Sequence, residues 1–325
     1  MTSFDSTSNT PNRYTGVICR AQGNLCDVAL LDATEEQHWI CSLRGKLKRQ
    51  VQAVTSLVAV GDEVIFTVLN EEQGVIESIG KRRSKLSRDN SQSQKRETEQ
   101  ILAVNIDYSV IVMASHAPDY NTRRLDWHLT AALAGDLQPV IVLSKVDLPE
   151  AQSAIEDIAR YRLLGYPLIA TSTKTNEGIE ELSQLLKGKK AVLVGSSGVG
   201  KSSLINAMDP QLQLRTGELR AKFQKGRHVT TTAELLRLQN GAWVIDTPGV
   251  RSFALWDRKE ETVEEQFSEF DSYADKCRFT DCSHIHEPGC AVREAVENGE
   301  IDCERYLAYT RIIKRQKERK PQFRG

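Results

Sequence analysis

The stretch Gly195-Ser196-Ser197-Gly198-Val199-Gly200-Lys201-Ser202 decides the fold of its domain. It matches the G-x-x-x-x-G-K-[ST] pattern, follows the apolar run Ala-Val-Leu-Val at 191–194 and precedes a helix start at 203–208. A buried strand, a glycine-rich turn and a helix are the setting in which this pattern forms a phosphate-binding loop. We therefore expect backbone N–H groups and the positive end of the helix to hold phosphates. Lys201 would reach the β- and γ-phosphates, and Ser202 would bind Mg²⁺.

Length and composition indicate a multidomain globular protein. A chain of 325 residues is too long for one typical domain, so we expect two or three. With 40% hydrophobic and 27% charged residues, the composition is that of soluble proteins. No apolar run approaches the roughly 20 residues of a membrane span. Residues 1–12 lack the basic start and apolar centre of a signal peptide, so we expect a disordered tail, a cytoplasmic location and no membrane partner.

The distribution of charge says more about partners than the net charge of −1 does. Basic clusters occupy residues 44–49, 81–88 and 311–324. Such clusters are commonly solvated faces, but three of them outside the nucleotide domain favour a polyanionic surface as partner.

The first domain, over residues 13–88, is expected to be a small β-barrel. Short β-rich runs at 15–19, 25–30, 38–41, 62–68 and 74–79 alternate with turn signals, and no convincing helix interrupts them. About five strands in some 75 residues favour an OB-fold. Because such barrels often bind oligonucleotides, we expect RNA contact here, although a fold alone does not prove that use.

The second domain, over residues 89–255, is expected to be α/β. A polar stretch at 88–99 is interpreted as a linker, and strands and helices alternate after it. This alternation predicts a mainly parallel sheet whose ligands lie at the carboxyl ends of its strands.

Three further motifs follow strands of this sheet. They are Ser144-Lys145-Val146-Asp147, Ser172-Thr173-Lys174 and Asp246-Thr247-Pro248-Gly249. Asp246 would hold Mg²⁺ through water, and the Gly249 amide would meet the γ-phosphate. We therefore expect four loops to converge on one nucleotide.

Two of these motifs resemble the base-recognition motifs of GTPases. Residues 144–147 resemble N-K-x-D, in which the carboxylate accepts two hydrogen bonds from guanine, and residues 172–174 resemble S-A-K. Ser144 stands where the family usually has Asn, which bears on base affinity more than on base identity. The predicted nucleotide-binding residues are Ser144, Lys145, Val146, Asp147, Ser172, Gly195, Ser196, Ser197, Gly198, Val199, Gly200, Lys201, Ser202, Ser203, Asp246 and Gly249.

The order of the motifs is that of a circularly permuted GTPase, because the base motifs precede the phosphate loop. With an upstream barrel and a downstream Cys/His cluster, the chain resembles the RsgA (YjeQ) family of small ribosomal subunit biogenesis GTPases over nearly all residues after 13. The resemblance implies hydrolysis of GTP to GDP with Mg²⁺, and the small ribosomal subunit and its rRNA as partners. It also implies late subunit maturation coupled to binding or release.

The segment 215–232 is expected to respond to the γ-phosphate. Thr230 or Thr231 would complete the Mg²⁺ shell. Val250, which follows D-x-x-G, cannot orient water as glutamine does in many GTPases. The resemblance points instead to His228 as the catalytic residue, with a solvated loop histidine as the alternative and a partner's arginine as a further contributor.

The third domain, over residues 256–325, is expected to bind one structural Zn²⁺ and to end in helices at 291–299 and 301–316 with a basic tail. Cys277, Cys282 and Cys290 lie within fourteen residues together with His284 and His286, and three thiolates with one imidazole match a closed tetrahedral site. The family pattern C-x4-C-x-H-x5-C favours His284 as the fourth ligand.

Two rival functions stay open on the sequence alone. One is an RNA-binding module for which GTP is only a regulatory ligand, and the other is an ATPase or small-molecule kinase. Because three modules need no second copy of the chain, we expect a monomer. The permuted order also leads from residues 246–249 directly into the third domain, so nucleotide state would bias the position of that domain.

Overall fold

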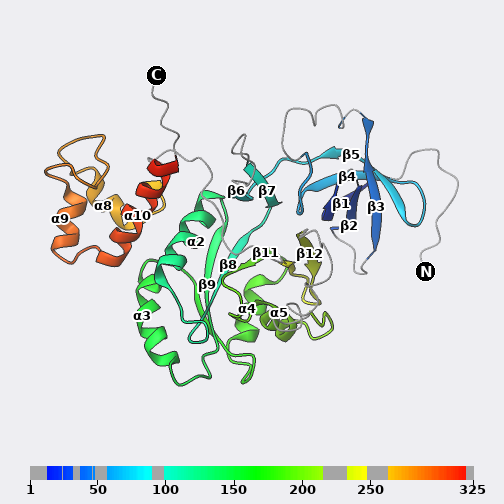
Figure 1. Ribbon diagram of the computed structural model, residues 1–325. Helices are drawn as coiled ribbons and strands as arrows, with labels where there is room; N and C mark the ends of the chain where they lie inside the picture. The colour runs from blue at the N-terminus through cyan, green and yellow to red at the C-terminus, as the bar shows by residue number, and fades with distance from the viewer. Residues whose placement is uncertain are drawn as a thin grey trace.

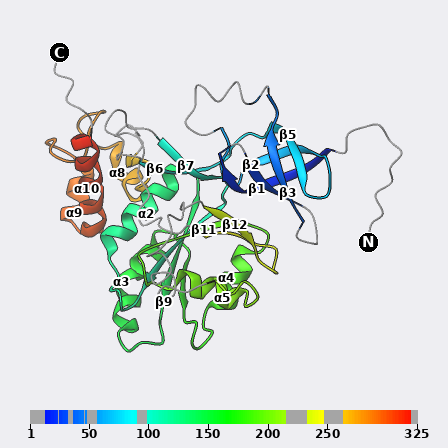
Figure 2. The same cartoon turned by 45° about the vertical axis from the view of Figure 1, so that its right-hand side comes forward.

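The protein is described by a computed structural model with three parts (Figure 1). A barrel and a group of C-terminal helices lie at opposite ends of a central α/β domain, and this arrangement is the same in the turned view of Figure 2. The structure describes residues 13–23, 25–31, 37–45, 47, 57–89, 99–214, 233–246 and 263–319. None of the helices in these ranges is long and apolar enough to cross a membrane.

The N-terminal part is a closed five-stranded barrel. Its strands are β1 (Arg13–Gln22), β2 (Leu25–Leu30), β3 (His38–Leu43), β4 (Glu63–Val68) and β5 (Gln73–Ile79). They close in the order β1-β2-β3-β5-β4, with β3 and β5 parallel and the other pairs antiparallel. The five predicted strands are all present, because alternating residues such as Val28, Trp39 and Phe66 fill one interior.

The central part is a six-stranded sheet in the order β10-β9-β8-β11-β13-β12. Its strands are β8 (Tyr108–Ala114), β9 (Gln138–Ser144), β10 (Leu168–Thr171), β11 (Lys190–Val194), β12 (Glu234–Arg237) and β13 (Trp243–Asp246). All neighbours are parallel except the edge strand β12, so the carboxyl ends of the other five strands share one edge. The continuous apolar runs of β8, β9 and β11 follow from burial on both faces.

Helices cover both faces of this sheet. Side chains of α2 (Thr122–Ala134) and α3 (Ala151–Leu163) share one buried core with one set of sheet residues, such as Ile141. Side chains of α4 (Ile179–Leu186) and α5 (Lys201–Met208) share another core with the alternate set, such as Val142. The domain is therefore a three-layer α/β fold, as the alternation predicted.

Two strands flank the polar stretch 88–99 that was interpreted as a linker, and overlap it only at its ends. The strands β6 (Lys85–Asp89) and β7 (Glu99–Val104) pair antiparallel on either side of residues 90–98, which lie outside the described residues. The sequence did not indicate these strands or the short edge strand β12, because none of the three shows an apolar–polar alternation of its own. A bridge between Val60 and Ala103 ties β7 to the barrel. The domain boundary expected between 88 and 89 stays a prediction.

The C-terminal part is helical and packs on α2. It contains η3 (Ser268–Phe270), α8 (Asp271–Ala274), α9 (Ala291–Glu297) and α10 (Cys303–Arg319), and α10 lies beside α2 in both views (Figures 1 and 2). The helix expected at 291–299 is two residues shorter, and the one expected at 301–316 begins and ends slightly later. Phe267, Phe270 and Tyr309 pack their rings together in the centre of this part.

Candidate functional site

The phosphate loop joins β11 to α5 through a backbone that requires glycine. Gly195, Gly198 and Gly200 have φ angles of 140°, 83° and 97°. A Cβ added at Gly195 would lie 2.1 Å from the carbonyl oxygen of Val112, far too close for any side chain. The loop therefore passes tightly over β8 and delivers the chain to the first turn of α5, where Ser202 and Ser203 lie beside Lys201.

Lys201 reaches back across the loop from the start of α5. Its Nζ donates to the carbonyl oxygens of Gly195 and Ser196, at 2.8 Å each. Arg124, in the first turn of α2, contacts the side chain of Ser196, because its Nη1 donates to Ser196 Oγ at 2.7 Å. Two cations therefore converge on the loop, and Arg124 is a contact that its sequence neighbourhood did not reveal.

Asp147 is arranged as an acceptor at the end of β9. Ser172 Oγ donates to Asp147 Oδ1 at 2.7 Å, and Lys174 Nζ lies 3.1 Å from Oδ2. The Ser172 hydrogen bond and then the Lys174 ammonium hold the pKa of Asp147 below its ordinary value. The carboxylate is therefore ionised at neutral pH and can accept the two N–H groups of guanine. Lys174 belongs to a quoted motif, but it was not among the predicted binding residues.

Ser144 ties the base loop to the phosphate loop. Its side chain is buried, and Oγ lies 2.5 Å from the carbonyl oxygen of Val199 and 3.1 Å from that of Met113. A hydroxyl has one hydrogen, so Ser144 donates fully to only one of these carbonyls at a time. The nearer partner belongs to the phosphate loop, which gives this serine a bridging role between two loops that are 55 residues apart in sequence.

The neighbouring base-loop residues fix the shape of that loop. Lys145 adopts a left-handed φ of 61° and donates from Nζ to the carbonyl of Ala117. The backbone N–H of Val146 donates to the carbonyl oxygen of Thr171 at 3.2 Å, and Thr171 directly precedes Ser172. The loops after β9, β10 and β11 therefore meet at one edge of the sheet.

The switch residues lie outside the described part of the site. They are His228, Thr230, Thr231 and Gly249, and the side chain of Asp246 lies outside it too. The backbone of Asp246 ends β13 next to β11, on the same edge as the phosphate loop. The catalytic and Mg²⁺-binding roles expected for these residues stay predictions.

A second site gathers three thiols and one imidazole in the C-terminal part. Ligand atoms of Cys277, Cys282, His284 and Cys290 all lie within 4.8 Å of one another. His284 Nδ1 lies 3.5 Å from Cys277 Sγ and 3.4 Å from Cys290 Sγ, and these two sulfurs are 3.9 Å apart. Tetrahedral zinc with Zn–S bonds near 2.3 Å separates its sulfurs by about 3.8 Å. The donor set and its spacing fit zinc.

The surroundings of this metal cluster support its chemistry. His284 Nε2 lies 3.0 Å from Glu264 Oε1, the kind of carboxylate partner that orients a ligating imidazole. Burial alone would raise the pKa of the Cys277 thiol, but hydrogen bonds from the backbone N–H groups of Val292 and Ala291 lower it below its ordinary value, whereas burial raises the pKa of the Cys282 thiol to about 12. His286 is exposed on the surface, whereas His284 is buried with the sulfurs. The geometry thus favours the histidine that the family pattern favours.

Known proteins resemble this chain in both sequence and structure. The sequence profile described as RsgA GTPase matches residues 79–256, and the profile described as RsgA N-terminal domain matches residues 15–76. The small ribosomal subunit biogenesis GTPase RsgA of Shewanella oneidensis is 40% identical over 290 residues, which are 86% of this chain and 78% of that protein. The protein of the same name from Geobacillus kaustophilus is 38% identical over 287 residues, covering 87% of this chain and 92% of that protein.

Two solved structures share the architecture. YjeQ from Thermotoga maritima superposes with a TM-score of 0.75 at 34% identity, covering 94% of this chain and 98% of that one. YloQ, described as a circularly permuted GTPase, superposes with a TM-score of 0.73 at 28% identity, covering 99% and 100%. These likenesses confirm the predicted fold class, a circularly permuted GTPase domain after an OB-like barrel.

Proposed function

This chain belongs to the RsgA family of GTPases, and we propose that it binds the small ribosomal subunit and couples GTP hydrolysis to its late maturation. The observation that carries the proposal is that the loops after β9, β10 and β11 meet at one edge of the sheet. Relatives named small ribosomal subunit biogenesis GTPase support the choice of partner. The protein would act on the small ribosomal subunit in the cytoplasm, as a monomer.

The nucleotide would be read at both of its ends. Asp147 would accept hydrogen bonds from guanine, and Lys201 would leave the loop carbonyls to meet the β- and γ-phosphates. Mg²⁺ would be held by Ser202, by Asp246 through water, and by Thr230 or Thr231. This ion would neutralise charge that develops on the transferred phosphoryl group.

Hydrolysis would depend on the switch histidine. We propose that His228 orients the attacking water, the role that Val250 cannot take. We expect the partner to raise the rate of hydrolysis by positioning His228, and the same contact would act on the proposed Mg²⁺-binding threonines, which follow the histidine by two and three residues. Because residues 246–249 lead directly into the C-terminal part, a change of nucleotide would alter the position of that part.

The flanking parts would hold RNA. The barrel, the basic clusters and the C-terminal helix would contact the phosphate backbone. Cys277, Cys282, His284 and Cys290 would hold one structural Zn²⁺, whose four bonds would fix the loop of residues 277–290 in one shape. This ion would stabilise the fold of the C-terminal part and would take no part in GTP hydrolysis.

The experiment that tests the proposal is steady-state GTP hydrolysis by the full chain, alone and with isolated small subunits. Large subunits and ATP serve as controls, and Lys201→Ala gives the background rate. We expect selective stimulation by small subunits and loss of it in His228→Ala. GTP binding without stimulation would favour the alternative, an RNA-binding module regulated by GTP, and an unchanged rate in His228→Ala would remove the role of the histidine.

A further inference from the structure

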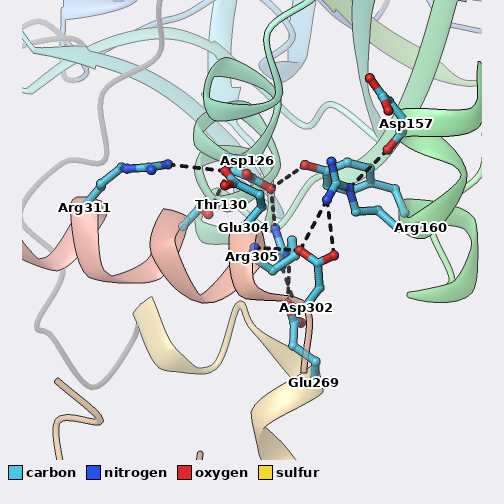
Figure 3. Close-up of polar contacts among 10 residues, drawn as sticks. Asp126, Thr130, Asp157, Arg160, Glu269, Asp302, Glu304, Arg305 and Arg311 are labelled. Atoms are coloured by element: carbon cyan, nitrogen blue, oxygen red, sulfur yellow. Dashed lines mark hydrogen bonds and ion pairs between the residues drawn. The ribbon is translucent and has the colours of Figure 1, made fainter. Parts of the chain in front are cut away.

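A buried ion cluster joins the C-terminal part to α2. Arg305, in α10, is 1% exposed, and its Nη1 donates to Asp126 Oδ1 at 2.7 Å while Nε donates to Glu269 Oε1 at 2.7 Å (Figure 3). Tyr161 OH donates to the same oxygen of Asp126 at 2.9 Å. We call Arg305, Asp126, Glu269 and Tyr161 the Arg305 cluster. It gathers residues from α10, α2, η3 and α3.

The Arg305 cluster forms a rigid attachment. The Arg305 guanidinium also lies over the ring of Phe267, with its central carbon 4.4 Å from the ring centroid. Because Asp126 and Arg305 are both almost fully buried, neither has water to replace a lost partner. The outer face of α2 is therefore fixed to α10 near the second turn of the helix.

The same helix contacts the phosphate loop. Asn121 caps α2 by accepting from the backbone N–H of Arg124, and the Arg124 side chain donates to Ser196 Oγ. Residues advance by about 100° around a helix, so Arg124 and Asp126 leave α2 in nearly opposite directions. One turn of helix therefore has the phosphate loop on one side and the C-terminal part on the other.

We propose that Arg124 is a positioning residue for the phosphate loop, and that the C-terminal part sets its position by holding α2 through Arg305. Arg124 holds the hydroxyl of Ser196, and Lys201 holds the carbonyl of that same residue. A shift of α2 would break the Arg124 bond and loosen the loop that must close around phosphate. This route runs through α2 and is separate from the switch segment that follows Asp246.

A double-mutant cycle on GTP affinity tests the proposal. Arg124→Ala, Ser196→Ala and Arg305→Met are each expected to weaken binding of a fluorescent GTP analogue by about threefold to tenfold, the effect of losing one ordinary solvent-exposed hydrogen bond. Combining Arg124→Ala with Arg305→Met should weaken it no further, since both changes break the same route. Effects that multiply in the double variant would overturn the proposal, as would unchanged affinity in either single variant.

Matched variants separate positioning from general damage. Arg123→Ala removes a neighbouring exposed arginine of the same helix and should leave affinity unchanged, and Arg124→Lys, which keeps a cationic donor, should recover part of the loss. Bound zinc and circular dichroism report folding of each variant. If Arg305→Met does not fold, Arg305→Lys takes its place in the cycle. The proposal then requires that Arg305→Lys cause no further loss of affinity in a chain that already carries Arg124→Ala.

Discussion

The metal cluster lies within the C-terminal part and the Arg305 cluster joins that part to the α/β domain, and the chain assembles the two in opposite ways. The metal cluster takes all four ligands from residues 277–290, whereas Arg305 and its partner Asp126 are 179 positions apart. Both bring polar groups into a buried place. The first needs only one loop and an ion, and the second needs four separate helical elements to pack together.

The two clusters also differ in what holds them. Thiolates and an imidazole at tetrahedral spacing would gain their stability from bonds to a metal, so the bound ion would stabilise the loop of residues 277–290. A buried ion pair gains little over an apolar contact but is costly to break, because the remaining charge has no partner. The metal cluster would therefore decide whether the C-terminal part folds. The Arg305 cluster would decide the position of that folded part against α2.

Loss of the metal should have the largest effect. Zinc binding contributes about 10 kcal/mol or more in small zinc domains. We expect Cys282→Ser to lose zinc and to expose residues 263–319 to protease, while the barrel and α/β domain stay resistant. Metal analysis and limited proteolysis measure this. Cys303→Ser, at an exposed cysteine outside the cluster, is the control and should keep its zinc; zinc retained by Cys282→Ser would contradict the assignment.

Breaking the Arg305 cluster should come next. Arg305→Met leaves Asp126 and Glu269 buried without their cation, which costs about 3–5 kcal/mol. We expect faster amide hydrogen exchange in α2 and α10, measured by mass spectrometry, with zinc still bound. Exchange that changes in α10 alone would mean that the cluster does not hold α2.

A carboxylate behind the metal cluster should matter less. Glu264→Ala removes the oxygen 3.0 Å from His284 Nε2, and loss of such partners weakens metal affinity by about tenfold. Competition with a zinc chelator measures the change. Glu265→Ala, at the adjacent exposed position, is the control, and equal affinities in the two variants would argue against a supporting role for Glu264.

The smallest effect is expected at the surface pair that joins the same two parts of the protein. Arg160 Nη1 lies 3.2 Å from Asp302 Oδ2, and both side chains are partly exposed (Figure 3). Exposed pairs contribute about 0–1 kcal/mol. Arg160→Met should therefore leave exchange in α2 nearly unchanged. If Arg160→Met increased exchange in α2 as much as Arg305→Met does, an exposed ion pair would matter as much as the buried one. Burial of the Arg305 charge would then not be the reason that α10 stays attached to α2.

The predictable features were those whose geometry depends on nearby residues. The glycines at 195, 198 and 200 have the φ angles that the phosphate-loop pattern implies, and the alternation of apolar runs gave the three-layer domain. The strands β6, β7 and β12 escaped notice because pairing partners, more than their own residues, make them strands.

Sequence by itself determined the phosphate loop, the permuted motif order and the grouping of the four proposed metal ligands, because backbone turns and ligand spacing act over a few residues. Tertiary structure alone decided that Ser144 bridges two loops, that Arg124 reaches Ser196 and that Asp126 neutralises Arg305. A charge or hydroxyl can be satisfied by any complementary group, so its partner is fixed only when distant segments pack together.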